Sequence, residues 1–160
     1  MNWHEKNAEF NALIKQLFHD NDWQKRAEAA RKLGMLKDGR ATNLMCRALR
    51  SEKDHIVVNK IIEALGRIGD ARATLRIIEK FKEEQEKNES DKFRIIYIIE
   101  GLTKIKDRRA LSYLGPLLDS SDDDIKNLAI NAFDIIEPKW KEIIERERNK
   151  SIQEIFKLKD

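Results

Sequence analysis

The side chains best suited to catalysis or metal binding, histidine and cysteine, are few and widely separated in this sequence. His4, His19 and His55 are scattered, and the one His-Glu pair is His4-Glu5. A metal centre needs several ligands that converge on one ion, and the sequence has neither an HExxH motif nor a second His-Glu pair. The sequence therefore predicts no metal site and no cofactor.

The only thiol belongs to Cys46, which excludes an intramolecular disulfide framework and a zinc site built from several cysteines. A nucleophilic thiol needs an activating base and an exposed setting, and no histidine is close to Cys46 in the sequence. We interpret Cys46 as a small packing residue. Because no set of catalytic residues is apparent, we predict that the protein is not an enzyme.

An acidic run, Asp119–Asp124, resembles a calcium-binding loop at first sight. An EF-hand loop requires glycine at its sixth position and glutamate at its twelfth, and these positions hold Asp124 and Ile130. We expect instead that Ser121 caps a helix whose first turn holds aspartates, where the helix dipole favours negative charge.

Three tryptophans, Trp3, Trp23 and Trp140, raise the question of an aromatic platform for nucleobases or a pigment. Large aromatic side chains contribute most to stability when they are buried. We therefore favour burial of these rings between helices or at the ends of the fold.

Charge is unevenly distributed along the chain. The 160 residues include 32 Lys or Arg and 29 Asp or Glu, and 41% are hydrophobic, which is enough for a core. Residues 24–109 hold 22 basic and 14 acidic side chains, a net charge of +8. This segment would attract acidic protein surfaces or nucleic acid, but the interleaved acidic residues favour a salt-bridged helical surface. The chain lacks a run of about 18 apolar residues and the apolar core of a signal peptide at its start, so we expect a cytoplasmic protein without a membrane segment.

An internal repeat organises the chain. Three segments, LGMLKDGRA from Leu33, LGRIGDARA from Leu65 and LTKIKDRRA from Leu102, share an apolar anchor, a second large apolar residue, an aspartate and an Arg-Ala pair. A weaker fourth copy begins at Phe133. Apolar residues three and four positions before each anchor, and at steps of four after each Arg-Ala pair, indicate helices. Each unit is thus predicted to be two helices joined by a turn that carries the aspartate.

These patterns predict an all-α fold in a single domain over residues 1–160. We expect an N-terminal cap helix within residues 1–21, repeats over 22–144 and an extension of the last helix over 145–160. The four anchors should be buried, and Asp38, Asp70 and Asp107 should cap the helices that follow them. The predicted helices cover residues 3–19, 23–36, 40–50, 55–68, 71–87, 91–105, 108–119, 122–136 and 139–157.

The repeated segments resemble HEAT repeats, and in particular the short HEAT-like repeats of phycobilisome lyases. The resemblance covers about residues 22–144 and implies a right-handed α-solenoid of about four helix pairs behind the N-terminal cap helix. It also implies that the second helices line a concave face. HEAT-like repeats occur in lyases, scaffolds, transport factors and DNA-repair enzymes, so the resemblance is more specific about fold than about function.

The predicted working surface is this concave face, which is mixed, polar and lightly basic. It suits a protein partner, such as an acidic peptide, bound by a scaffold or adaptor without chemistry. The alternatives are nucleic-acid binding through the basic central repeats and a bilin-lyase-like enzyme subunit. The recurrence of Arg40, Arg72 and Arg109 with the repeat favours a ladder of ion pairs over phosphate binding. The candidate contact residues are Arg40, Asn43, Arg47, Arg72, Arg76, Glu79, Lys80, Arg109 and Ser112.

The C-terminal segment leaves two alternatives open. A helix over 139–157 would carry Ile152, Ile155 and Phe156 beyond the body of the stack, where an exposed apolar stripe would mediate self-association. Alternatively, the helix ends near Asn149 and the last residues fold back or fray.

Overall fold

The computed structural model describes residues 1–158, and within this range the chain is helical, without a β-strand. The predicted all-α class is confirmed. The helices are α1 (Trp3–His19), α2 (Trp23–Leu36), α3 (Ala41–Ser51), α4 (His55–Ile68), α5 (Thr74–Gln85), α6 (Lys92–Ile105), α7 (Leu111–Leu114), α8 (Asp123–Ile136), α9 (Trp140–Arg146) and α10 (Ile152–Phe156). Three short 3-10 turns add to them: η1 (Ala71–Ala73), η2 (Arg108–Ala110) and η3 (Gly115–Asp119).

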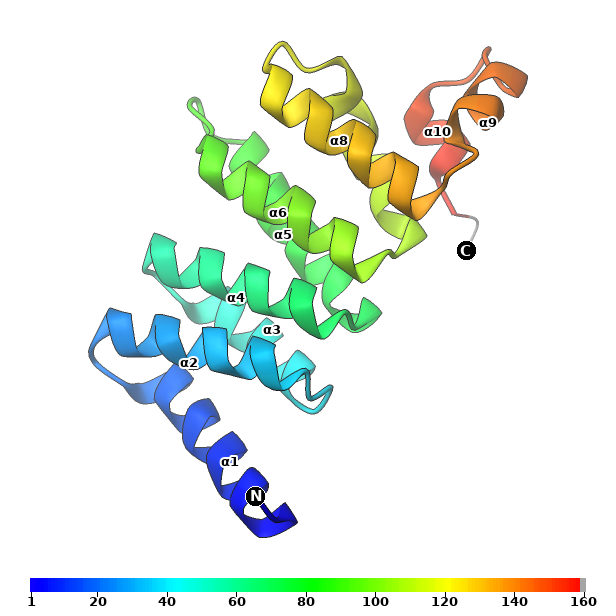
Figure 1. Cartoon of the computed structure of the whole chain (residues 1–160). Helices are drawn as coiled ribbons and strands as arrows, with labels where there is room; N and C mark the ends of the chain where they lie inside the picture. Colours follow the sequence, from blue (N-terminus) through cyan, green and yellow to red (C-terminus); the bar gives the residue numbers. More distant parts are fainter. Residues whose placement is uncertain (159–160) are drawn as a thin grey trace.

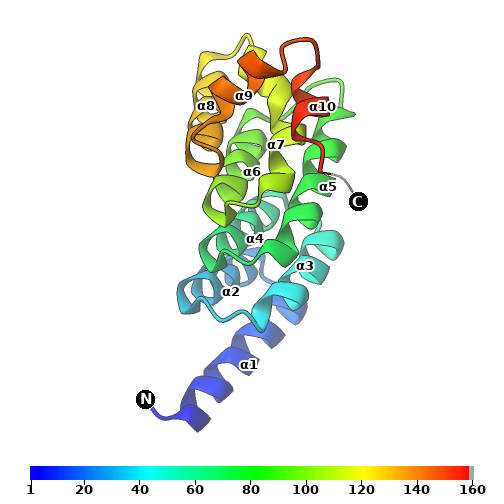
Figure 2. The ribbon, with the colours of Figure 1, turned by 90° about the vertical axis from the view of Figure 1, so that its right-hand side faces the viewer.

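The helices form a stack of two rows. Helices α2, α4, α6 and α8 lie side by side in the first row (Figure 1). Helices α3, α5 and α7 form the second row behind it, and α1 projects from one end of the stack (Figure 2). Helices α9 and α10 lie at the opposite end, beside α8 and α7.

The structure pairs the helices differently from the prediction, which joined the two helices of each pair by the turn that carries the aspartate. Helix α3 packs directly against α4, and α5 against α6, whereas the turns that carry the aspartates connect one such pair to the next. Helix α1 packs along α2 in the same way, as the first helix of a pair. Both kinds of connection are short, so sequence spacing alone could not distinguish the turn within a pair from the turn between pairs.

Aspartates begin every helix of the first row. Asp22, Asp54, Asp91 and Asp122 each lie eleven residues before an anchor, and each side chain accepts a hydrogen bond from the second backbone amide after it. Such caps satisfy amides that the helix itself leaves without a partner. Asp122, and not the predicted Ser121, caps α8 because its carboxylate accepts from the amides of Asp124 and Ile125.

The first row is packed closely enough for backbones to touch. The anchors Leu33, Leu65, Leu102 and Phe133 are fully buried, as predicted. A Cβ atom added to Gly34 would lie 2.8 Å from the Cα atom of Ala64, and one added to Gly66 would lie 2.8 Å from the Cα atom of Gly101. These small residues therefore set the spacing of α2, α4 and α6.

The second row is spaced more widely, because the backbones of α3, α5 and α7 approach one another at far fewer positions than those of α2, α4 and α6, and long side chains bridge it. An ion pair of 3.1 Å between Arg50 and Glu79 spans the distance from α3 to α5. Because a stack bends toward its more closely spaced row, the inner side is the row of α2, α4 and α6. The expectation that α3, α5 and α7 line the concave face is therefore wrong. It followed from the predicted pairing, in which these three were the second helices of their pairs, whereas in the observed pairing they are the first helices.

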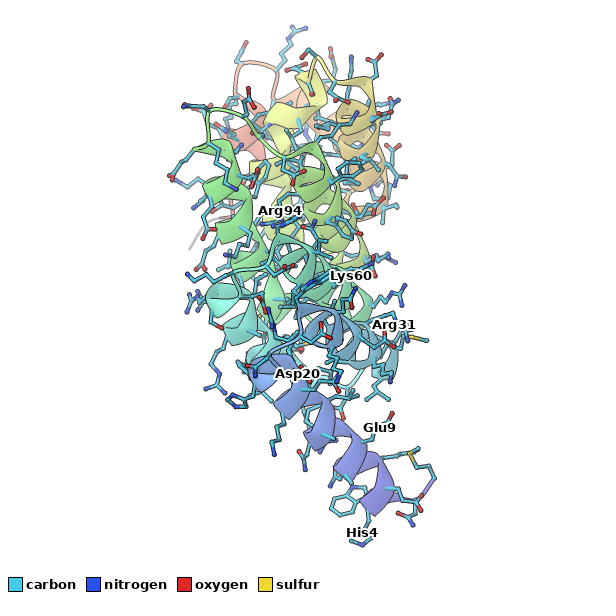
Figure 3. All side chains as sticks on the ribbon, turned by 90° about the vertical axis from the view of Figure 1, so that its left-hand side faces the viewer. His4, Glu9, Asp20, Arg31, Lys60 and Arg94 are labelled. Carbon is cyan, nitrogen blue, oxygen red and sulfur yellow. The ribbon has the colours of Figure 1, made fainter. Side chains whose placement is uncertain are left out.

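A buried polar contact joins α4 to α6 within the first row. The Nε atom of Arg94 donates to Oδ1 of Asn59 at 2.5 Å, and its Nη2 atom donates to the carbonyl oxygen of His55 at 3.3 Å. Both side chains belong to residues that are nearly buried, and Figure 3 labels Arg94 at this junction.

The predicted long C-terminal helix is wrong. Helix α9 ends at Arg146, the chain reverses, and Ser151 and Glu154 form a capping box that starts α10. Phe156 is 2% exposed and meets the ring of Phe133 edge-on at 5.4 Å. The chain after α9 thus folds back, as far as residue 158, which is the second of the two alternatives, because Phe156 gains more by packing on Phe133 than by remaining in water. Residues 159 and 160 of the predicted extension lie outside the described residues.

Candidate protein-interaction surfaces

The aspartate turns between pairs are structural. Oδ1 of Asp70 accepts from the backbone amide of Arg72 at 2.9 Å, and its Oδ2 atom lies 2.6 Å from the Arg72 guanidinium. Oδ2 also accepts from the hydroxyl of Thr42 at 3.1 Å, across to the preceding turn. Asp38 and Asp107 accept from the amides of Arg40 and Arg109 in the same way. The predicted capping role is confirmed for Asp70 and Asp107, which cap the 3-10 turns η1 and η2 that lead into α5 and α7. Asp38 accepts the amide of Arg40 but does not cap α3, because Arg40 itself is the N-cap residue of that helix.

Arginines link each turn to the one before it. Nη2 of Arg72 donates to the carbonyl oxygen of Gly39 at 2.9 Å, and Nη2 of Arg109 donates to that of Ala71 at 3.1 Å. Arg40, in the first turn, reaches Oδ1 of Asn7 in α1 at 2.9 Å. These contacts make the recurrent arginines the ladder that their periodicity indicates.

The ladder also changes the acidity of its carboxylates. Hydrogen bonds from the Arg72 guanidinium lower the pKa of Asp70 from its ordinary value of 3.8 to about 2, with further help from the Arg72 amide and the Thr42 hydroxyl. The carboxylate of the folded protein therefore stays mostly charged until the pH falls to about 2.

The structure brings together only part of the predicted contact surface. Asn43, Arg72, Arg76 and Arg109 line a hollow of about 500 Å³ between the helices of the second row. Five predicted contact residues lie outside that lining: Arg40, Arg47, Glu79, Lys80 and Ser112.

Most of the charged groups in the predicted contact surface already have partners within the chain. Besides the ladder arginines, Arg76 pairs with Glu79 at 2.6 Å, and Lys80 pairs with Glu83 at 3.1 Å. Within residues 1–158, Asn43 and Arg47 make no side-chain hydrogen bond or ion pair. The second row therefore presents little free positive charge.

A second hollow, which sequence reasoning missed, lies at the ends of the first-row helices. It measures about 600 Å³ and lies where α2, α4 and α6 end, toward the right of Figure 1. Arg67 is 3.9 Å from Glu63, whereas the three lysines have no ion pair within the described part of the chain. We call this site the basic hollow; its lining residues are Met35, Lys37, Gly66, Arg67, Gly69, Lys104 and Lys106.

The repeat itself contained the signal for the basic hollow. Met35, Arg67 and Lys104 each follow an anchor by two residues, and Lys37, Gly69 and Lys106 each follow one by four. These two columns hold four basic residues and no acidic one. Reading the repeat by columns would have shown that positive charge gathers wherever the three helices end together.

The tryptophans do not share one environment. Trp140 is buried against Phe133, with its ring nitrogen donating to Asp134 at 2.7 Å. Trp3 is 68% exposed, and Trp23 is also exposed. The expected burial is therefore wrong for these two rings, which lie in the first turns of α1 and α2, where fewer neighbouring helices cover them.

The other residues considered for chemistry lie apart. Within residues 1–158, no group of three or more His, Cys, Asp or Glu side chains is placed to hold a metal ion. Burial raises the pKa of the Cys46 thiol, which disfavours the reactive thiolate. His4 lies at the far end of α1 (Figure 3). None of the helices in the described range is both long and apolar enough to cross a membrane.

Comparison with known proteins agrees with this architecture. A family model of HEAT repeats matches residues 10–88, from within α1 to just beyond α5. The chain is a HEAT-like repeat protein. Its fold is an all-α HEAT-like solenoid. HEAT repeats generally mediate protein–protein interactions, and proteins built from them are typically non-enzymatic scaffolds. No curated protein matches the sequence significantly.

Proposed function

We propose that this HEAT-like protein is a non-enzymatic scaffold that binds a protein partner on the exposed face of α2, α4, α6 and α8. The main support for this proposal is the exposure of Phe93, a large apolar side chain in the first turn of α6 that is 71% exposed. Ile56 occupies the equivalent position in the neighbouring helix α4 and is also exposed. Aromatic side chains are enriched at protein interfaces, and their exposure to water has no stabilising role in the free chain.

The rigidity of the stack supports recognition by a preformed surface. The arginine ladder ties each turn to the previous one, and the glycine contacts hold α2, α4 and α6 at backbone distance. A surface that does not have to be ordered on binding loses less conformational entropy when the partner arrives. The second row contributes chiefly to this rigidity, because its charges are paired within the chain.

Site-specific photo-crosslinking in the native source tests the proposal. Phe93→p-benzoylphenylalanine places the probe on the first row, and Arg47→p-benzoylphenylalanine places it at an exposed position on the second row as a matched control. We expect adducts from position 93 that protease removes and nuclease does not, that excess unlabelled protein suppresses, and that position 47 does not form.

Two results would contradict the scaffold proposal. Nuclease-sensitive adducts at position 93 would favour nucleic-acid binding by the basic central repeats instead. Adducts of equal yield at positions 93 and 47 would show that the first row is not a specific binding face.

A further inference from the structure

Two lysines at the basic hollow adopt a backbone conformation that lysine rarely takes. Lys37 has φ 50° and ψ 36°, and Lys106 has φ 61° and ψ 30°, both in the left-handed region at the end of a helix. The equivalent residue of the middle repeat is Gly69, with φ 75°. Glycine is the usual residue at such a helix end, because a Cβ atom makes the left-handed conformation costly.

Both strained positions line the same hollow. Lys37 and Lys106 end α2 and α6 and stand on either side of Gly69, which ends α4. Non-glycine residues held in the left-handed region cluster at binding sites, where the surrounding structure offsets the strain. Neither lysine forms an ion pair within residues 1–158. No ion pair in the described part of the chain therefore compensates for the strain of having lysine instead of glycine at these positions.

The helix dipole gives an alternative reason for basic residues here. The C-terminal end of a helix carries partial negative charge, which stabilises a nearby cation. Lys104 and Arg67 already lie in the last turns of α6 and α4, however, and they adopt ordinary helical backbone. The dipole therefore explains a basic last turn, but it does not explain why lysine replaces glycine at the left-handed positions.

The shape of the hollow indicates what it accommodates. Gly69 leaves part of the floor without a side chain, because a Cβ atom there would approach no atom more closely than the carbonyl oxygen of Gly66 at 4.0 Å, so a ligand's backbone can approach the end of α4 closely. Met35, more than half exposed, supplies an apolar wall, and the four basic groups surround the rest. No aromatic side chain is among the lining residues on which a nucleobase would stack.

We infer that the basic hollow binds an extended acidic peptide segment, whose carboxylates contact Lys37, Arg67, Lys104 and Lys106 and one of whose apolar side chains rests on Met35. The inference rests on the proposed scaffold function and names the segment of the partner that the scaffold holds. Lys37 and Lys106 are its specificity-determining residues, since they project positive charge from opposite sides of the site.

Fluorescence anisotropy of a dye-labelled octaglutamate peptide with the full chain tests the inference. We expect binding that weakens with salt, and an affinity about tenfold lower for the double variant Lys37→Glu/Lys106→Glu. The matched control is Lys53→Glu/Lys126→Glu, which changes the net charge equally at two exposed lysines outside the hollow. The control should change the affinity less than about twofold, as expected from long-range charge alone.

Glycine variants separate binding from helix capping. Lys37→Gly and Lys106→Gly relieve the left-handed strain, so each should raise the midpoint of thermal unfolding while it lowers affinity for octaglutamate. A lowered midpoint would mean that the lysines serve their own helices, and this would overturn the inference even if the affinity fell.

Other results of the binding measurements also test whether the hollow binds an acidic peptide. Equal losses in the two double variants, or no binding of octaglutamate at low salt, would overturn the inference. Tighter binding of an oligothymidine of equal charge, lost in Lys37→Glu/Lys106→Glu, would reassign the hollow to nucleic acid. If octaglutamate fails while position 93 still forms its protein adducts, the peptide inference fails and the scaffold proposal stands.

Discussion

Asp70 shows how one side chain can serve both its own turn and its neighbour. Its carboxylate accepts the amide of Arg72, pairs with the guanidinium of the same residue, and accepts the hydroxyl of Thr42 from the preceding repeat. The capping role could be predicted from the sequence, because an aspartate two residues before a helical arginine has the spacing of a cap. The contact with Thr42 could not, because it depends on how one repeat stacks on the next.

Asp70→Asn should make stability less dependent on pH. The folded pKa of about 2 lies below the ordinary value of 3.8, so the ionised carboxylate stabilises the fold above about pH 4, and this contribution disappears as the pH falls toward 2. We expect the substitution to lower the free energy of unfolding by about 1–2 kcal/mol at pH 7. Urea unfolding at pH 7 and pH 2.5 measures this.

The difference between the wild type and Asp70→Asn should shrink at pH 2.5, because this pH lies well below the ordinary pKa of 3.8 that the carboxyl has in the unfolded chain and close to its folded pKa of about 2. Asp123→Asn is the control, because Asp123 is exposed and its side chain makes no hydrogen bond within residues 1–158. It should change the free energy of unfolding by less than about 0.5 kcal/mol at pH 7. An undiminished gap between wild type and Asp70→Asn at pH 2.5 would contradict the assignment of the ion pair.

Among the elements, the approach of α4 to α6 depends on two glycines that face one another. Glycine ordinarily weakens a helix relative to alanine, so Gly66 within α4 is unfavourable for that helix alone. The contact of Gly66 with Gly101 supplies the compensating gain, since neighbouring backbones come together without an intervening side chain.

Gly66→Ala should therefore destabilise the protein despite alanine's better helix propensity. The new Cβ atom would lie 2.8 Å from the Cα atom of Gly101, so the helices must separate, and we expect a loss of about 1–3 kcal/mol in chemical denaturation. Gly39→Ala is the matched control: its Cβ atom would meet only side-chain atoms at 3.7 Å and beyond. Equal effects of the two substitutions would show that the helix contact is not what Gly66 provides.

The C-terminal helices show where prediction from local sequence fails. Glu147, Arg148 and Ser151 interrupt the apolar stripe without breaking a helical pattern decisively. The break is decided instead by a distant contact, the packing of Phe156 on Phe133. The basic hollow was missed for a related reason. Its residues are distant from one another along the chain, and they come together only when the three repeats are compared position by position and stacked as α2, α4 and α6.

Phe156→Ala should lower stability rather than change the association state. Its ring is buried within the chain, so its removal should cost about 3–5 kcal/mol in the free energy of unfolding. Urea denaturation measures the loss, and light scattering follows the mass. Lys157→Ala, at the exposed neighbouring position, should have little effect. A dimeric wild type that Phe156→Ala converts to a stable monomer would contradict the internal role of this ring.

For the whole molecule, the stack is a one-dimensional array in which each pair depends on its neighbours. Helices α4 and α6 have first-row neighbours on both sides, whereas α1 and α10 lie near the ends. In repeat arrays, stability is the sum of each repeat and its interfaces, so the ends open more readily than the middle.

Hydrogen exchange should therefore follow position in the stack. We expect the slowest amide exchange in α4 and α6 and exchange at least about tenfold faster in α10 and the first turns of α1. Exchange mass spectrometry of overlapping peptides measures this gradient. Uniform protection from α1 to α10 would mean that the stack opens only as one cooperative unit.

The buried contact between Arg94 and Asn59 implies that the repeats are not interchangeable. Each pair has a similar outline, so shape alone would tolerate a chain whose pairs had been shuffled. Suppose that the α5–α6 pair followed a pair without an asparagine at the position of Asn59. The Arg94 guanidinium would then be buried while its Nε atom had no hydrogen-bond acceptor. Burying a charge in this way costs several kcal/mol. The Arg94 guanidinium thus selects α4 as the neighbour of α6, and this contact fixes the order of the repeats as well as their spacing.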